Sequence, residues 1–226
     1  MLRYYAGLYL FVTLCLPGPS GVCVCQEKLW EPDLDDVVGI RGWAIFNSIV
    51  HPLTDGTRKG VRFEERKGGA LAWYPEVEFS NGVIEFDARG KNVPQMSFLG
   101  VAFHGVSERF YDAIYFRPFN FKARDSVARH HAVQYISPPE HGWKELREQH
   151  PGMYENAVQP VPDPDSWIHV RVVVEFPRVS VFVNDETRPC LVVNQLSDRR
   201  SGWVGLWVGD DSDGDFSNLR VTHSGD

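Results

Sequence analysis

Apolar and polar residues alternate along most of the chain after Gln26, and runs at helical spacing are scarce. Such alternation is typical of strands that bury one face, because successive side chains of a strand point to opposite sides. The pattern predicts ten strands: Val61 to Glu65, Ala70 to Tyr74, Gly82 to Arg89, Ser97 to His104, Ala113 to Arg117, Ala132 to Ile136, Trp167 to Phe176, Val179 to Val183, Gly202 to Val208 and Phe216 to Val221. Only Glu140 to Gln149 has the pattern of a short helix.

Turn-forming residues separate the predicted strands. Lys67 to Gly69, Ser80 to Gly82, Asn184 with Asp185, and Asp213 with Gly214 favour hairpins or short loops. Many short strands at this spacing predict an all-β sandwich or barrel. No low-complexity linker or internal repeat divides residues 26–226, so we expect a single domain there.

The first 25 residues have the pattern of a signal peptide. Arg3 is the only charge ahead of the apolar run from Leu8 to Leu16, which the helix-breaking segment Pro17 to Gly21 then stops. The run is shorter than the ~20 residues that span a bilayer, so we expect a secreted or periplasmic protein with no membrane span. A lipoprotein acylated at Cys23 or Cys25 is the alternative, although valine precedes both cysteines where a small residue is normal.

Cysteine and charge counts narrow the class of protein further. If cleavage follows Cys25, Cys190 alone remains of the four cysteines, so no internal disulfide forms. A chain of this length buries a sufficient core without one. The formal charge of −7 gives no basic footprint for nucleic acid or anionic lipid. Phe, Tyr and Trp make up 13% of the residues, which suits a sandwich core or a sugar-stacking surface.

The strand Gly82 to Arg89 carries its charged residues on one face and its apolar residues on the other. Other predicted strands also carry aromatic, histidine and arginine side chains on the face that does not point into the core. We expect a polar concave groove on a curved sheet, formed by Glu85, Asp87, Arg89, His104, Tyr115 and Arg117. The alternative is an ordinary solvated face with cross-strand ion pairs, each worth less than ~1 kcal/mol.

Three runs of sequence carry a family resemblance: Phe79 to Gly90 (FSNGVIEFDARG), Tyr111 to Phe121 (YDAIYFRPFNF) and Gly202 to Arg220 (GWVGLWVGDDSDGDFSNLR). They resemble the laminin G-like and 3-keto-disaccharide-hydrolase-like group of concanavalin A-like domains. The resemblance covers nearly all of residues 26–226 and implies a jelly-roll sandwich of two antiparallel sheets. It does not define an activity, because this fold hosts lectins, adhesion modules and glycosidases.

Family 16 glycoside hydrolases share that fold and carry the strand motif Glu-x-Asp-x-Glu or Glu-x-Asp-x-x-Glu. By this resemblance Glu85 occupies the nucleophile position and Asp87 the helper position, whereas Arg89 replaces the last Glu. The acid/base residue of that route is therefore missing, and we consider Glu85, Asp87 or His104 as the group that transfers a proton.

A second group of candidate ligand-binding residues lies between Arg129 and Trp143 and includes Gln134 and Tyr135. Trp143 is suited to stacking on a pyranose face, and Glu140 or His141 to moving protons. A metal site formed by the histidines of this segment is the less favoured alternative, because adjacent residues of a strand face opposite ways. The simplest alternative is that these side chains only cap the sandwich edge.

Aspartates alternate in the run from Gly209 to Asp215. Asp211, Asp213 and Asp215 present hard oxygen ligands of the kind that calcium prefers, and structural calcium fits the laminin G resemblance. The alternative is a solvated hairpin turn. No cofactor is otherwise required.

Three function classes remain open. The protein is predicted to bind carbohydrate, as an oligo- or polysaccharide, in the concave groove. The first alternative is a glycoside hydrolase, similar to 3-keto-disaccharide hydrolases, that uses Glu85 and Asp87 as acid and base. The second is a non-catalytic adhesion or protein-binding sandwich.

Overall fold

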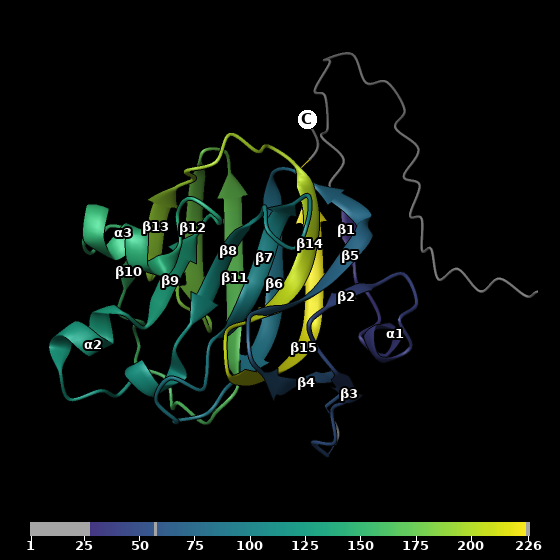
Figure 1. The fold of residues 1–226 in the computed structure, drawn as a ribbon, viewed down its shortest axis with the longest axis horizontal. Coiled ribbons are helices and arrows are strands. Elements are labelled where there is room, and N and C mark those ends of the chain that lie inside the picture. Colours follow the sequence, from purple (N-terminus) through teal and green to yellow (C-terminus); the bar gives the residue numbers. More distant parts are fainter. Residues whose placement is uncertain (1–27, 57, 225–226) are drawn as a thin grey trace, which may run out of the picture.

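The computed structural model describes residues 28–56 and 58–224, which fold into two stacked antiparallel sheets (Figure 1). The order of strands in sheet A is β13 (Leu191–Asn194), β12 (Arg178–Val183), β11 (Ile168–Glu175), β6 (Gly82–Arg89), β15 (Ser212–His223), β4 (Val61–Arg66) and β3 (Val50–Pro52), with β1 (Lys28–Trp30) also paired to β15. The order in sheet B is β10 (Glu155–Asn156), β9 (Val133–Ile136), β8 (Asp112–Phe116), β7 (Leu99–Gly105), β14 (Gly202–Val208), β5 (Ala70–Phe79) and β2 (Ala44–Phe46).

The core lies between the sheets and is built from alternate positions of the strands. In β11 the β-branched residues Ile168, Val170, Val172 and Val174 are buried, and the residues between them are exposed or half-buried. This alternation leaves the outer face of sheet A polar. In β7 and β8 every residue is buried, so both faces of sheet B are covered by side chains.

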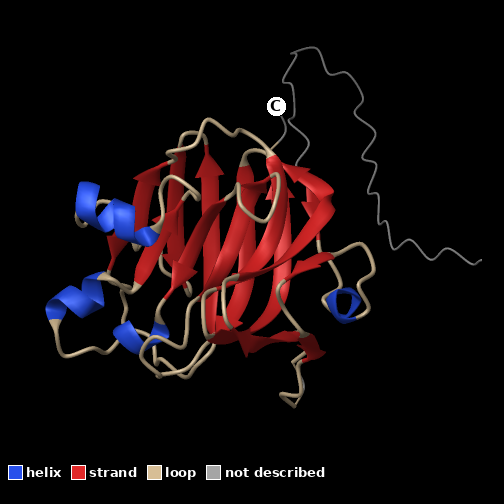
Figure 2. Cartoon of the chain, viewed as in Figure 1, coloured by secondary structure: helices blue, strands red, loops and turns tan. Residues whose placement is uncertain are grey.

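Within the portion of the chain that the structure describes, four short helical segments lie outside the sheets (Figure 2). Those beside the β9 and β10 edge of sheet B are α2 (Ser126–His130), α3 (Trp143–Gln149) and the 3₁₀ turn η1 (Pro118–Asn120), and α1 (Asp35–Val38) lies on the opposite side. The predicted helix Glu140 to Gln149 begins only at Trp143, directly after Gly142. None of the helices in the described part of the chain is long and apolar enough to cross a membrane.

Most predicted strands are confirmed, two of them (β6 and β14) with the predicted bounds. The strands β1, β2, β3, β10 and β13 were not predicted, because each is too short to show a period. The predicted turn at Asp213 and Gly214 is wrong, since both residues lie inside β15, where Gly214 pairs with Phe63 of β4 and Asp213 lies at a register shift. The reversal comes earlier, at Asp211, whose φ is 49°.

The predicted signal peptide, with Cys15, Cys23 and Cys25, lies outside the described residues. Cys190, the remaining cysteine, is buried as a free thiol.

Candidate functional site

The predicted site residues do not share one groove. Glu85, Asp87 and Arg89 lie on the outer face of sheet A, because the residues between them point into the core. Tyr115 and Gln134 face each other across β8 and β9 on the outer face of sheet B. The expected convergence is therefore wrong. Alternation tells which residues of a strand share a face, but it does not tell which sheet a strand joins.

Asp87 is the centre of a polar group on sheet A. The β6 register places it opposite His169 of β11 and Ser217 of β15. Its Oδ1 accepts a hydrogen bond from His169 Nδ1 at 2.8 Å, and its Oδ2 accepts from Asn218 Nδ2 at 2.6 Å and from Arg58 Nη1 at 2.5 Å. Three donors from three parts of the chain thus hold one carboxylate that is nearly buried.

Asn218 reaches Asp87 because β15 is irregular at this point. The pairing of β15 with β6 shifts register between Ser217 and Arg220, and Asn218 adopts a left-handed conformation with φ of 53°. A bulge of this kind re-aims one side chain out of the regular alternation, and asparagine tolerates the conformation well.

His169 lies between the two candidate carboxylates. Its Nδ1 bonds to Asp87, while its Nε2 is 3.7 Å from Oε1 of Glu85. Its side chain is 40% exposed, so the ring is open to solvent. Asp87 thereby fixes the orientation of an accessible imidazole.

A pocket of about 590 Å³ opens over this group, between sheet A and the segment before α1. Its polar wall includes Asp87, His169, Asn218, Lys59 and Arg220, and its apolar lining includes Leu219. The volume lies in the range of ordinary small-ligand sites, and the mixture of charged, amide and imidazole groups suits a ligand rich in hydroxyl groups.

Arg89 lies on the same outer face of sheet A and is paired with two aspartates. Its guanidinium bonds to Asp215 at 2.7 Å and to Asp55 at 2.7 Å. The ring of Trp167 lies close to both Arg58 and Arg89, at 4.5 and 4.9 Å from the guanidinium carbons.

The predicted calcium site at Asp211, Asp213 and Asp215 is wrong. Both oxygens of Asp215 are bound by Arg62, at 2.6 and 2.8 Å, and Asp213 pairs with Lys91 at 3.2 Å. Cations of the protein therefore already neutralise these carboxylates. Across residues 28–56 and 58–224 no group of three or more His, Cys, Asp or Glu side chains is placed to hold a metal ion, which also applies to the histidines near Trp143.

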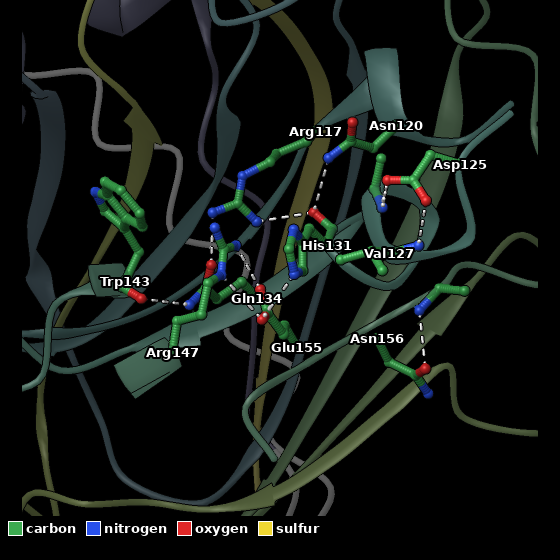
Figure 3. Close-up of polar contacts among 12 residues, drawn as sticks. Arg117, Asn120, Asp125, Val127, His131, Gln134, Trp143, Arg147, Glu155 and Asn156 are labelled. Atoms are coloured by element: carbon green, nitrogen blue, oxygen red, sulfur yellow. Dashed lines mark hydrogen bonds and ion pairs between the residues drawn. The ribbon is translucent and has the colours of Figure 1, made fainter. Parts of the chain in front are cut away.

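A second polar group lies on the outer face of sheet B and is drawn in Figure 3. We call it the Arg117 cluster, and its members are Arg117, Gln134, His131, Arg147 and Glu155, which Figure 3 labels, together with Tyr115. Arg117 Nη2 donates to Gln134 Oε1 at 2.5 Å and also to the Tyr115 hydroxyl, and its Nη1 donates to the carbonyl of His131 at 2.8 Å. Tyr115 donates in turn to Gln134 Oε1 at 3.0 Å.

Glu155 is the carboxylate of the Arg117 cluster. Arg147 binds it with two hydrogen bonds of 3.1 and 2.7 Å, and His131 Nε2 lies 3.2 Å from its Oε1. Burial dominates the titration of the neighbouring groups: it raises the pKa of Tyr115 to about 12 and lowers the pKa of Arg117 and of His131. Arg147 and Glu155 were not predicted, since an isolated charge in the sequence carries no signal that it will be buried.

Trp143 stands beside this cluster and is 51% exposed. Its carbonyl oxygen lies 3.5 Å from Gln134 Nε2, and its ring lies 5.3 Å from the guanidinium carbon of Arg147, one helical turn further along α3. In Figure 3 its indole lies on the same side of the cluster as the Arg117 guanidinium. Glu140 and His141 lie in the loop before α3, where the backbone of His141 pairs with Ser137.

His104 and Tyr135 lie in the interior rather than at either outer face. Ser80 O is 2.8 Å from His104 Nε2, Gln195 Nε2 is 3.0 Å from its Nδ1, and burial lowers the pKa of its imidazole. Tyr135 donates to the buried Asp112, which also accepts from Arg199 at 3.1 Å. His104 was predicted to act with Glu85 and Asp87, and the structure separates it from them.

The fold resembles several solved structures at low sequence identity. The carbohydrate-binding module CBM66 from Bacillus subtilis matches with a TM-score of 0.56 at 15% identity, over 80% of this chain and 95% of that chain. The carbohydrate recognition domain of Emp46p in its metal-free form matches with a TM-score of 0.53 at 16% identity, over 87% and 97% of the two chains. A putative glycosyl hydrolase from Parabacteroides distasonis matches with a TM-score of 0.53 at 11% identity, over 87% and 99%.

These likenesses establish the fold, which is an all-β sandwich of the concanavalin A-like, jelly-roll kind. No family model matches the sequence. Nor does the sequence of any curated protein match it.

Proposed function

We propose that this protein binds carbohydrate in the sheet A pocket. The observation that carries the proposal is the 590 Å³ pocket whose wall holds Asp87, His169 and Asn218 in a fixed polar group. Carboxylate, amide and imidazole side chains held by mutual hydrogen bonds are suited to the paired hydroxyl groups of a sugar ring. The likeness in fold to proteins named as a carbohydrate-binding module and a carbohydrate recognition domain supports this ligand class.

The hydrogen bonds that Asp87 accepts favour a binding protein over a hydrolase. Its two oxygens already accept three hydrogen bonds, one of them from an arginine. A carboxyl group that delivered a proton to a glycosidic oxygen would have to give up such contacts. Asp87 is thus better suited to orienting its neighbours than to acting as an acid.

Glycoside hydrolysis is the second candidate, and the position of His169 supports it. An accessible imidazole that one carboxylate orients, and that has Glu85 at 3.7 Å from its other nitrogen, has the parts needed to exchange a proton with a substrate. In this version Asp87 positions His169, and Glu85 with His169 transfers the proton.

The test is a glycan array, followed by calorimetry with the tightest glycan. Asn218→Ala removes one wall group and one donor to Asp87, so we expect its affinity to fall by about tenfold, as for the loss of a charge-assisted hydrogen bond. Glu64→Gln is the control, because Glu64 is an exposed residue of sheet A that does not line the pocket. Absence of glycan binding would favour the adhesion or protein-binding alternative.

Turnover assays with the same glycans, and with 3-keto sugars, separate binder from enzyme. In a hydrolase, Glu85→Gln and His169→Gln should each lower the rate about 100-fold to 10,000-fold while binding persists. Turnover that survives both substitutions excludes these residues as proton-transfer groups.

We also propose export through the signal peptide predicted at residues 1–25. Mass determination of the protein recovered from the extracellular or periplasmic fraction tests this, with a new N-terminus between Val22 and Gln26 as the expected result. An acylated cysteine would instead identify a lipoprotein.

A further inference from the structure

The Arg117 cluster contains more positive than negative charge. Its guanidinium groups are those of Arg117 and Arg147, and its single carboxylate is that of Glu155. Arg147 occupies both oxygens of Glu155, whereas Arg117 donates only to the neutral oxygens of Tyr115, Gln134 and His131. Among the described residues no carboxylate lies within ion-pair distance of Arg117, so the cluster carries a net charge of +1 when His131 is neutral.

This charge is buried, which makes it unusual within the molecule. Arg117 is 5% exposed and Glu155 is 4% exposed. A buried charge without a counter-ion is costly, whereas a buried charge that is paired and hydrogen-bonded is tolerated. Elsewhere in this protein the buried carboxylates Asp112 and Asp215 each have an arginine partner. Arg117 therefore lacks an oppositely charged partner, whereas Asp112 and Asp215 have one.

The cluster is open to solvent on the side of α3. The side chain of Arg147 is 31% exposed, and the indole of Trp143 beside it is half exposed. An aromatic ring next to an accessible guanidinium offers two kinds of contact at once: an apolar surface for the C–H face of a sugar ring and a planar fork for an anion.

We propose that this face is a second binding site, separate from the sheet A pocket, that takes a carboxylated sugar such as a uronic acid. The sugar ring stacks on Trp143, and its carboxylate accepts hydrogen bonds from the Nη1 and Nη2 end of Arg147, because Glu155 is bound by the Nε and Nη2 edge. Arg117 lies behind Arg147 and supplies the positive charge that Glu155 does not neutralise. A planar carboxylate matches the guanidinium fork, and a neutral sugar would leave the charge uncompensated.

The overall charge of the protein makes this site selective. At −7 the chain as a whole does not attract acidic polymers. Binding of a uronate therefore depends on local contacts, and variants of those contacts should abolish it.

The test uses trigalacturonate and its fully methyl-esterified form, titrated into the full-length protein by calorimetry. We expect the acid to bind and esterification to weaken binding at least about tenfold, since it removes the charge. Trp143→Ala should also weaken binding about tenfold with only a small change in Tm, because half of the indole is exposed. Arg147→Lys keeps the charge and its pairing with Glu155 but loses the fork, and should weaken binding about fivefold to tenfold.

Two control variants test whether trigalacturonate binds at this face. Lys144→Gln changes an exposed charge on the same helix and should alter the affinity less than twofold. Asn218→Ala disables the sheet A pocket and should leave trigalacturonate binding unchanged, so failure of one proposal is distinguishable from failure of the other. A sulfated galactan trisaccharide tests whether carboxylate is the preferred anion.

The proposal is overturned if trigalacturonate does not bind, if its methyl ester binds equally well, or if Trp143→Ala has no effect. Tighter binding of the sulfated sugar would overturn the assignment to a carboxylate.

Discussion

The two buried carboxylates on the outer face of sheet A have arginine partners, whereas the buried Arg117 on sheet B has no carboxylate partner. Asp215 is bound by Arg62 and Arg89, and Asp87 by Arg58. Arg117 makes three hydrogen bonds, as Asp87 does, but all of its acceptors are neutral. Satisfied hydrogen bonding and balanced charge are thus separate properties, and only the second distinguishes the two faces.

The difference suggests different uses for the two faces. On sheet A the ion pairs of Asp215 connect β4, β6 and β15, and the pair with Arg58 holds Asp87 in the wall of the pocket. On sheet B the hydrogen bonds of Arg117 join β8 and β9 but leave its charge without a carboxylate partner, and the charge lies next to an exposed tryptophan. The predictions below test this contrast by removing charge from each face.

The largest effect is expected for Asp215→Asn. Asp215 is 1% exposed and bonds to two guanidinium groups, so the substitution leaves Arg62 and Arg89 without their shared carboxylate. We expect the free energy of unfolding to fall by about 3 to 5 kcal/mol, measured by urea denaturation. Arg41→Gln breaks the exposed pair with Asp36 and serves as the control, with no measurable change expected. A small effect of Asp215→Asn would show that charge pairing does not stabilise this face.

A smaller effect is expected for Arg117→Met. Tyr115 and Gln134 still bond to each other, and the carbonyl of His131 retains the donor Asn120 at 3.3 Å. Because the substitution also removes an uncompensated buried charge, the loss in free energy of unfolding should not exceed about 1 to 3 kcal/mol. A loss as large as that of Asp215→Asn would contradict the contrast between the faces.

Stability should decrease as pH falls below about 6.5, the ordinary pKa of histidine. Burial lowers the pKa of His104 and of His131 in the folded state, so unfolding takes up protons at lower pH and the unfolded state is favoured there. Each group contributes a slope of at most about 1.4 kcal/mol per pH unit. Urea denaturation from pH 5 to 8 measures how the free energy of unfolding changes with pH.

His104→Gln should remove part of this pH dependence. His130→Gln is the matched control, because His130 is exposed at the end of α2. An unchanged slope in His104→Gln would show that this histidine binds protons equally in the folded and unfolded states, contrary to the expected effect of burial.

The smallest effect on stability is expected when a reducing agent is added. Cys190 is a buried free thiol, and burial raises its pKa to about 12, so reducing agent should leave Tm unchanged. Labelling with a thiol reagent, read at the Cys190 peptide by mass spectrometry, should be slow in buffer and fast in denaturant. A marked drop in Tm on reduction would indicate a disulfide, formed either with another cysteine of the chain or between two copies.

Several site residues could be predicted and several could not. Glu85, Asp87, Arg117, Gln134 and Trp143 were identified from the sequence because polar or aromatic residues at alternate strand positions, or at a loop end, stand out against an apolar pattern. His169, Asn218, Arg147 and Glu155 were missed. Asn218 reaches its partner only through a bulge, and the others are single polar residues whose neighbours come from distant strands.

The alternation in the sequence determined by itself that this chain is an all-β sandwich or barrel, because it fixes the strands and the inward face of each strand locally. The resemblance to concanavalin A-like domains implied the sandwich of two antiparallel sheets. Only the tertiary structure decided which sheet each strand joins, and hence that Asp87 and Arg117 lie on opposite outer faces. It also decided which carboxylates are neutralised: Asp213 and Asp215, predicted as calcium ligands, meet Lys91, Arg62 and Arg89 across the sheet. Pairing between strands depends on contacts between residues far apart in the chain, and a local pattern carries no information about them.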